Sequence, residues 1–442
     1  MMKAVLLASP EPARAARTVR ARVAFVLPRA DWIECNASLI SRLAADEDVA
    51  VALVGPEGCA IPAGLAPGDV VAYPFFTEPR SGPGVNRLGE VYRDAWVRRQ
   101  TIDRFFSEFK PDCLVVISTT SREMLPWVRL ARRQGRKVLQ LQSVFLAPNL
   151  RAHIRGENLR LLRHRGADGL GRLVLRRFIQ AIAGLPGTVF KSPEQAAGAD
   201  RVFAINAAQG AIYREHMVPD RVEITGAPLL DYLQDRVSQS ARMSSEAAFR
   251  AQWQIAPAAP IAVYVSKSLE KFCQDDPAHE REFQAFATRA FLDRFPDAVL
   301  IIKLHPIEDA RAFQDVVGHP RVRIIKDGDI HQIVHIAQLV ISLGTSTPAF
   351  YAVFHGRPRV IIQEADGIPL DYQRQLLDVS VAVRTRPELE AVFDDLRAAG
   401  WPAVLSENFA TCGDGSRQFG ADLEGASTPR VHASLRRFLE LP

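Results

Sequence analysis

Cysteine is scarce in this sequence: there are five among 442 residues, widely separated and odd in number. Such a set does not fit a disulfide framework, and no Cys-x-x-Cys pair indicates a zinc site. We therefore expect a protein of a reducing compartment that is not stabilised by disulfides or by structural zinc.

Long hydrophobic runs are missing as well. No stretch approaches the roughly 18–20 uncharged apolar residues that a transmembrane helix needs. The first nine residues hold one lysine and the short run Ala-Val-Leu-Leu-Ala, which is too short for a signal-peptide core. The expectation is a cytoplasmic protein, either soluble or peripheral at the inner membrane.

A strong charge imbalance is also absent, since the formal net charge is +5, but the excess is concentrated in one segment. Residues 151–177 contain eight arginines against two acidic residues, and apolar side chains are interspersed over 151–178. A basic amphipathic stretch indicates contact with a membrane surface or with an anionic, lipid-linked acceptor, and the alternative is a solvated helical face. Nucleic acid is disfavoured because no recognised binding module accompanies the arginines.

What the sequence does contain is a regular alternation of short apolar runs with longer amphipathic stretches. This pattern is typical of buried parallel strands joined by crossover helices. In the first half the expected strands are Val23–Leu27, Val49–Val54, Val70–Ala72, 113–118, Lys137–Leu141, Arg201–Ala204 and Val222–Ile224, with helices over Ala37–Ala45, Leu88–Phe109 and Ser121–Arg136. The second half repeats the theme with strands Ile261–Val265, Val299–Lys303, Val322–Lys326, Leu339–Ser342 and Arg359–Gln363, and helices Ala278–Arg294, Ile330–Ala337 and Thr347–Phe354.

The alternation predicts an α/β chain of two Rossmann-like, doubly wound domains that face a cleft. A polar stretch near residues 231–260 separates the halves. We expect an N-terminal domain over 1–235, a C-terminal domain over 236–425 and a terminal helix over 426–442, with Val431–Leu441 as its amphipathic part.

The polar residues of the second half cluster where the expected strands end. His305 and Pro306 follow one strand, and Ser342, Thr345, Ser346 and Thr347 lie between another strand and a helix start. Hydroxyls and free backbone N–H groups at such a position can hold a phosphate, and a histidine facing it can stabilise a departing nucleotide. The alternatives are an ordinary turn histidine and simple helix capping.

This block resembles the nucleotide-binding half of GT-B glycosyltransferases. The sequence Lys303-Leu304-His305-Pro306 is similar to the His-Pro motif of bacterial sialyltransferases, Kdo transferases and polyglycerol- or polyribitol-phosphate transferases. The resemblance implies a CMP-sugar or CDP-alcohol donor, with His305 on the donor phosphate and Ser346 and Thr347 as the matching hydroxyl pair. It also implies that the loop after Lys326 holds the base, through Asp327, Gly328 and Ile330.

One feature of the GT-B pattern is missing. Many of these enzymes bind ribose through a glutamate in the helix after the Ser/Thr loop, and here that stretch reads Pro348-Ala349-Phe350-Tyr351. Asp327-Gly328-Asp329 has the form of a metal-binding Asp-x-Asp, but after a strand it is better interpreted as a turn. Lys267 is a further candidate phosphate contact, with a solvated lysine as the equal alternative.

An acceptor hydroxyl needs a general base, which we expect in the first half. Asp31 is the favoured candidate and Glu34 the second, while Glu78, Glu90 and Asp94 are competitors. Other polar or aromatic residues near the expected strand ends are candidates for acceptor binding: Trp32, Thr119, Thr120, Gln142 and Ser143.

The resulting hypothesis is an inverting glycosyltransferase without metal or other cofactor. It would move a sugar, or a polyol phosphate, from a cytidine-type donor to a glycan or lipid-linked glycan in surface polysaccharide synthesis. One alternative is an enzyme similar to UDP-N-acetylglucosamine 2-epimerases, a family with carboxylates at two strand ends where this chain has Ser118-Thr119-Thr120 and Gln142-Ser143. The other alternative is a non-catalytic nucleotide-binding scaffold.

Overall fold

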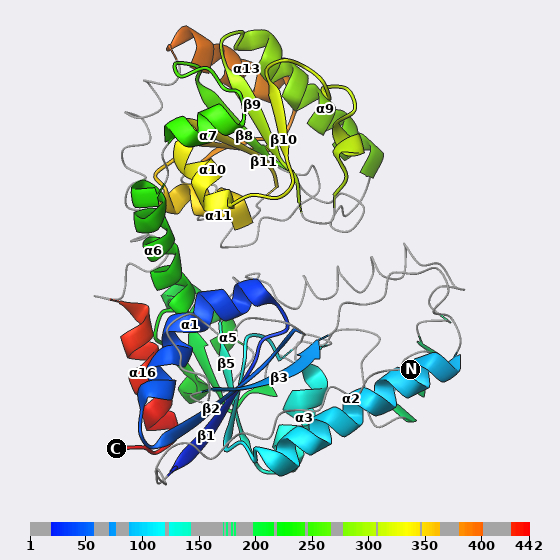
Figure 1. The fold of residues 1–442 in the computed structure, drawn as a ribbon, viewed down its shortest axis with the longest axis vertical. Coiled ribbons are helices and arrows are strands. Elements are labelled where there is room, and N and C mark those ends of the chain that lie inside the picture. Colours follow the sequence, from blue (N-terminus) through cyan, green and yellow to red (C-terminus); the bar gives the residue numbers. More distant parts are fainter. Residues whose placement is uncertain are drawn as a thin grey trace. The chain divides into compact units, whose positions relative to one another are not determined.

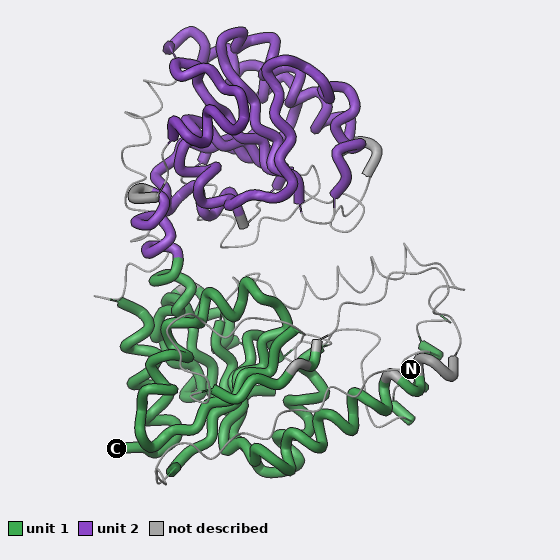
Figure 2. The backbone as a smooth tube through the Cα atoms, viewed as in Figure 1, with its two compact units in different colours: residues 1–232, 422–442 green, residues 233–421 purple. Residues whose placement is uncertain are grey.

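The computed structural model describes two compact units of the chain, each built on a parallel β-sheet (Figures 1 and 2). Unit 1 comprises residues 1–232 and 422–442, and unit 2 comprises residues 233–421. Within them the structure describes residues 19–56, 70–76, 88–119, 123–142, 171, 174–175, 178–179, 181–182, 198–215, 219–243, 246–266, 277–305, 308–344, 347–362, 380–400 and 426–442.

Unit 1 contains a seven-stranded sheet with the strand order β3-β2-β1-β4-β5-β6-β7. The pairings between its neighbouring strands are all parallel. The strands are β1 (Ala21–Val26), β2 (Val49–Pro56), β3 (Val70–Phe76), β4 (Cys113–Val116), β5 (Lys137–Leu141), β6 (Arg201–Ala204) and β7 (Val222–Ile224). The helices are α1 (Ala30–Ala45), α2 (Leu88–Glu108), α3 (Leu125–Arg133), α5 (Ala207–Arg214), the 3₁₀ turn η2 (Pro219–Arg221) and α16 (Ser427–Phe438).

Unit 2 contains a six-stranded parallel sheet with the order β10-β9-β8-β11-β12-β13. Helix α6 (Pro228–Met243) leads into it and α7 (Glu246–Gln252) follows. The strands are β8 (Ile261–Val265), β9 (Val299–Lys303), β10 (Val322–Ile325), β11 (Leu339–Leu343), β12 (Arg359–Ile362) and β13 (Val381–Val383). The remaining helices are α9 (Pro277–Arg294), η3 (Ala310–Phe313), α10 (Ile330–Ile336), α11 (Thr347–Phe354) and α13 (Arg386–Ala398).

Both faces of the unit 2 sheet are covered by helices, which explains why its strands read as continuous apolar runs rather than alternating ones. Ala262 and Tyr264 of β8 pack in one core cluster together with α9 and α13. Ile261, Val263 and Val265 pack in the other, together with α7 and α10. The expected doubly wound α/β architecture is therefore confirmed for this half of the chain.

The order of strands determines where a site can form. In both sheets the chain runs outward from a central strand and then reverses, so that the switch point lies between β1 and β4 in unit 1 and between β8 and β11 in unit 2. Loops leave such a sheet in opposite directions at the switch point and open a crevice at the carboxyl ends of the strands. Most of the predicted site residues follow these strand ends.

Candidate functional site

The switch point of unit 2 brings together three of the predicted polar segments. Ser266 follows β8, His305 closely follows β9, and Ser342 and Gly344 lie at the end of β11. Strand β8 pairs with both β9 and β11, so these three ends are neighbours at one edge of the sheet. The expectation that these segments share one sheet edge is confirmed for the described residues.

The backbone of His305 is hydrogen-bonded to Glu308 and to Ser266, the residue that follows β8. The backbone N–H of Glu308 donates to the His305 carbonyl at 2.9 Å, and the His305 N–H donates to Ser266 Oγ at 2.8 Å. Ser266 in turn donates its hydroxyl hydrogen bond to a carboxylate oxygen of Glu308. The histidine side chain is half-buried, whereas Ser266 and Glu308 are buried.

Lys303, the first residue of the His-Pro motif, connects the ends of β9 and β10 through hydrogen bonds of its buried side chain. Its Nζ donates to the Lys326 carbonyl at 2.7 Å and to the Leu304 carbonyl at 3.0 Å. The side chain is 8% exposed, and burial lowers its pKa below the usual lysine value. Lys303 therefore joins β9 to β10, a role that the sequence pattern did not reveal.

The loop after β11 begins with a tightly held turn. Ser342 is 1% exposed, and its hydroxyl donates to the Gly344 carbonyl at 2.8 Å. Gly344 has a φ of +67°, a conformation that glycine adopts without a Cβ penalty. Helix α11 starts at Thr347, where orphan backbone N–H groups and the helix dipole favour an anion. The predicted contacts Thr345 and Ser346 lie outside the described residues, as do Lys267 and Pro306, and the Thr347 side chain is not described.

The third residue of the Asp327-Gly328-Asp329 loop has a structural role as a helix cap. Asp329 is the N-cap of α10, where its carboxylate accepts from the His331 N–H at 2.9 Å, and it also pairs with Arg236. A capping carboxylate already bound in this way favours the turn interpretation over a metal-binding Asp-x-Asp. Asp327 and Gly328 are exposed, and Ile330 packs partly against the core.

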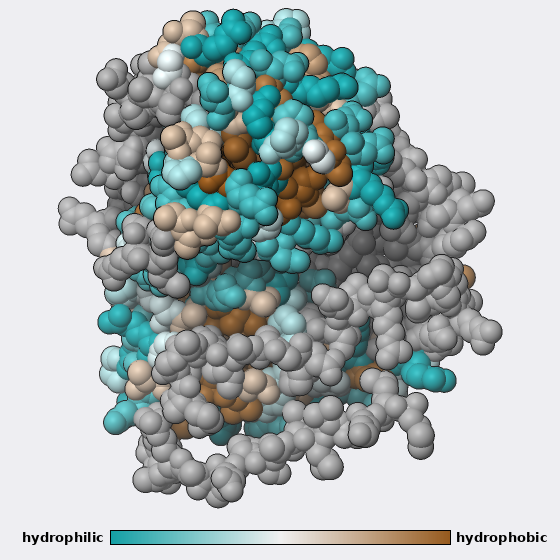
Figure 3. Space-filling model, turned by 45° about the horizontal axis from the view of Figure 1, so that its top comes forward, coloured by the Kyte–Doolittle hydropathy of each residue, from teal (hydrophilic) through white to brown (hydrophobic). Residues whose placement is uncertain are grey.

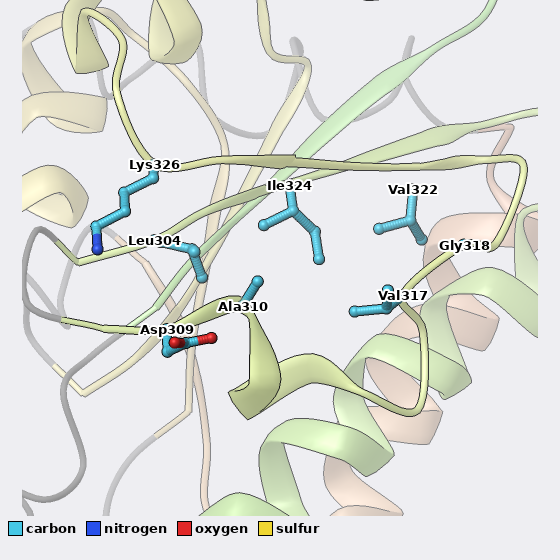
Figure 4. A pocket seen from close by; sticks show the side chains of 8 residues that line it. All are labelled: Leu304, Asp309, Ala310, Val317, Gly318, Val322, Ile324 and Lys326. Atoms are coloured by element: carbon cyan, nitrogen blue, oxygen red, sulfur yellow. The ribbon is translucent and has the colours of Figure 1, made fainter.

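A cavity of about 510 Å³ lies against the edge strand of unit 2 (Figure 4). It occurs where the crossover from β9 to β10 is built on the four-residue helix η3 instead of a long helix. Leu304, Val322 and Ile324 provide an apolar lining, while Lys326 and Asp309 lie toward one end. Figure 3 likewise shows hydrophobic residues reaching the surface of unit 2 among hydrophilic ones.

In unit 1, the predicted base Asp31 lies just after β1 and is paired with Arg29. Asp31, in the first turn of α1, is about half exposed and accepts two hydrogen bonds from the Arg29 guanidinium, at 2.9 Å and 2.5 Å. The same guanidinium lies 5.2 Å from the ring centre of Trp32. Glu34 is exposed, and the Tyr232 hydroxyl lies 3.4 Å from its Oε2. Proton transfer to Asp31 would therefore compete with Arg29 for the same oxygens.

Two predicted acceptor contacts lie inside unit 1 instead of on its surface. Thr119 is fully buried and donates to Gln140 Oε1 at 3.0 Å, and Gln140 donates to the Tyr213 hydroxyl at 2.8 Å. Gln142 is also fully buried, where it accepts from the Ile205 N–H and donates to Gln209. Both side chains hold the ends of β4, β5 and β6 together through these buried hydrogen bonds.

Several other predicted features fall on residues that the structure does not describe. Thr120, Ser143 and Glu78 are among them, as are the side chains of Glu90 and Asp94. Most of the basic segment 151–178 lies outside the described residues too. In the described parts of the chain, no helix is both long and apolar enough to cross a membrane.

Comparison with known proteins gives similarity of fold at low sequence identity. No family model matches the chain, and no curated protein matches it. The glycotransferase of kitacinnamycin is 16% identical with a TM-score of 0.57, covering 96% of this chain and 100% of its own. S. aureus MnaA with UDP is 11% identical with a TM-score of 0.60, covering 96% and 98%. A Neisseria meningitidis UDP-GlcNAc 2-epimerase bound to UDP-GlcNAc is 13% identical with a TM-score of 0.57, covering 90% and 97%.

These similarities extend over nearly the whole chain, which matches the two parallel sheets described above. They include glycosyltransferases and epimerases alike, so the fold alone does not choose between the two activities. The chain has the GT-B-like architecture of two Rossmann-like α/β domains.

Proposed function

We propose that this protein is a glycosyltransferase that uses a nucleotide-activated, cytidine-type donor and transfers a sugar, or a polyol phosphate, to a glycan acceptor. The observation that carries the proposal is the placement of His305 just after β9, with β8 alone between that strand and β11, which leads to α11. A half-buried imidazole and a helix N-terminus at the same sheet edge form a suitable environment for the phosphates of a leaving nucleotide.

In this proposal the charge that develops on the leaving phosphate is neutralised by chain groups. His305 donates a hydrogen bond to it, and the N-terminus of α11 supplies the favourable end of a helix dipole. The loop of Asp327, Gly328 and Ile330 provides the surface for the base. Asp31 is the general base for the acceptor hydroxyl in an inverting transfer, with Trp32 placed to stack on a sugar ring and Glu34 as a second acceptor contact.

Cell-envelope polysaccharide is the proposed product, with a glycan or lipid-linked glycan as acceptor. The support is the basic segment 151–178, of which the described apolar side chains Val174, Leu175 and Phe178 are 47%, 44% and 61% exposed. Exposed apolar residues among arginines are suited to an anionic lipid surface. Co-sedimentation with anionic vesicles, with neutral vesicles as control, tests this part of the proposal.

The epimerase alternative has less support from the described residues. It requires acidic groups after the strands that correspond to β4 and β5, and this chain has the buried, hydrogen-bonded Thr119 and Gln142 at those ends. Proton transfer at a sugar carbon would lack its groups there. Incubation with UDP-GlcNAc, followed by NMR of the products, tests this alternative, because an epimerised sugar would appear.

The donor assignment is tested by thermal-shift and calorimetric binding of CMP, CDP, UDP and GDP. We expect the cytidine nucleotides to stabilise the protein, and His305→Ala to weaken their binding about tenfold or more, as expected for a lost charged hydrogen bond. His319→Ala is the matched control, since His319 lies in unit 2 just before β10, outside the proposed site. Binding of UDP or GDP alone would overturn the cytidine assignment.

A further inference from the structure

The backbone N–H and the backbone carbonyl of His305 both form hydrogen bonds, and both partners lie outside the His-Pro pair. Its N–H donates to Ser266 Oγ at 2.8 Å, and its carbonyl accepts the Glu308 N–H at 2.9 Å. Ser266 directly follows β8, and its backbone N–H donates to the Lys303 carbonyl at 3.0 Å. The backbone that carries the imidazole is thereby fastened to the neighbouring strand.

The orientation of the Ser266 hydroxyl is set by Glu308. An ionised carboxylate can only accept, so the hydroxyl proton points to Glu308 and an oxygen lone pair faces the His305 N–H. A serine hydroxyl otherwise rotates freely, and it would not discriminate between donating and accepting at this position. Ser266 is 3% exposed and Glu308 is 8% exposed, so water does not compete strongly for these bonds.

This geometry argues against direct chemistry by either residue. The proton of Ser266 is already used by Glu308, so the hydroxyl is not oriented to donate to a phosphate. Glu308 is buried and engaged with Ser266, unlike its exposed neighbour Asp309. The contacts that these two side chains make lead instead to the backbone of His305.

We propose that Ser266 and Glu308 are positioning residues that hold the His305 backbone, so that the point from which the imidazole extends is set before the donor phosphates bind. The inference rests on the proposed function for its consequence, because His305 is the group that would contact the donor. A backbone that is fixed beforehand loses less conformational entropy on binding than a free one, and the gain appears as nucleotide affinity.

The affinity experiment compares Ser266→Ala in the wild-type and His305→Ala backgrounds by calorimetry with the best nucleotide of the panel. We expect Ser266→Ala alone to weaken binding about five- to tenfold, in line with the loss of one buried hydrogen-bond partner. In the His305→Ala background the same substitution is expected to change affinity less than twofold, because its effect passes through His305. An equal loss in both backgrounds would overturn the inference.

Glu308 is tested by a conservative and a non-conservative variant. Glu308→Gln retains an oxygen that can accept from Ser266, so affinity should stay within about threefold of wild type. Glu308→Ala removes the acceptor and should match Ser266→Ala, with no additional loss in the double variant. Ser238→Ala is the control, since Ser238 is an exposed serine on α6 whose hydroxyl bonds to the Gln234 carbonyl of its own helix.

A readout without ligand separates this inference from the proposed function. The imidazole resonance of His305, assigned by its loss in His305→Ala, is observed by NMR of the full chain at one fixed pH. In Ser266→Ala we expect a shifted or broadened His305 signal, with the His319 signal unchanged. An unaltered His305 signal contradicts the positioning role, whereas failure of every nucleotide to bind, with the shift still present, overturns only the proposed function. If Ser266→Ala does not fold, Glu308→Ala supplies the same comparison.

Discussion

His331 Nδ1 lies 3.3 Å from His355 Nε2 inside unit 2, so two buried imidazoles share one hydrogen bond. His331 is stacked on the Tyr351 ring with a centroid separation of 4.3 Å. Among the described residues, His355 Nδ1 has no hydrogen-bond partner. The pairing is therefore best satisfied when His355 donates from Nε2 and leaves Nδ1 unprotonated, because a buried N–H without an acceptor costs more than a bare nitrogen.

This pair predicts acid-labile folding. Burial, with smaller effects from neighbouring positive charge, lowers the pKa of His331 to about 4 and that of His355 to about 3, against an ordinary value of about 6.5. Arg236, Arg357 and His335 disfavour the charged forms, while Asp329 favours them. Between about pH 6.5 and pH 4 the unfolded chain binds more protons than the folded one, so stability falls as the pH falls.

The expected loss is on the order of 5 kcal/mol between pH 7 and pH 4.5, measured as the free energy of urea unfolding. In His355→Gln the slope against pH should be shallower, because one of the two titrating groups is gone. His319→Gln leaves the His331–His355 pair intact, so its curve of stability against pH should run parallel to that of wild type. Parallel curves for wild type and His355→Gln would contradict the assignment of acid sensitivity to this pair.

The two described cysteines are expected to resist alkylation in the native protein. Burial, with Asp31 and Glu34 adding to it, raises the pKa of Cys35 to about 12, and burial also raises the pKa of Cys113. Thiolate is the reactive form, so iodoacetamide at pH 8 should modify both residues only after denaturation. Mass spectrometry of the peptides checks this, and native labelling of Cys113 at the denatured rate would show that its strand opens.

Much of the fold could be predicted because buried parallel strands leave a simple trace in the sequence. Strand β9 was expected over Val299–Lys303 and lies there, since its apolar run contacts helices on both faces. Helix α1 was expected from Ala37 but begins at Ala30, because its first turns carry the exposed Asp31 and Glu34 beside the buried Ile33. Strand β13 was not predicted, although β7, which also has three residues at a sheet edge, was.

The candidate site was predictable only as far as strand ends determine it. The rule that carboxyl ends of parallel strands gather at one edge was enough to predict that His305, after β9, and Ser342, at the end of β11, lie at the same edge of the sheet. The relation of Ser266 to Glu308, 42 residues apart, depends on a tertiary contact that no local pattern reports. Thr119 and Gln142 were candidates for acceptor binding on the same ground: their position at strand ends could be predicted, but their burial could not.

The hydrogen bonds of the Lys303 side chain predict a loss of folding stability in Lys303→Met. Methionine retains the apolar stem but leaves the Leu304 and Lys326 carbonyls without their donor, which should cost about 1–3 kcal/mol of stability. Lys303→Arg keeps donors at the site and should lose less. Lys326→Met is the matched control because that side chain is exposed, and it should change stability by less than about 0.5 kcal/mol. Chemical denaturation of the three variants measures these differences, and equal stability of Lys303→Met and wild type would show that these hydrogen bonds add no stability.

The docking of the C-terminal helix onto unit 1 predicts the effect of Gly226→Ala. Gly226 has a φ of +79°, and a Cβ added there would lie 2.3 Å from Ser427 Oγ and 2.8 Å from Ser427 Cβ. Ser427 begins α16 and cannot yield easily, because its N–H donates to Asp231 at 2.8 Å. Backbone strain and the displacement of α16 together should cost about 3 kcal/mol.

Gly135→Ala separates these two contributions. Gly135 also has a positive φ, +67°, but nothing lies within 4 Å of its added Cβ, so only the backbone strain of roughly 1–2 kcal/mol should appear. The difference between the two variants in thermal and urea unfolding then measures the cost of moving α16. Combining Gly226→Ala with Ser427→Gly removes the clashing side chain and should recover most of that difference. Equal losses in Gly226→Ala and Gly135→Ala would mean that α16 moves away from Gly226 at no cost.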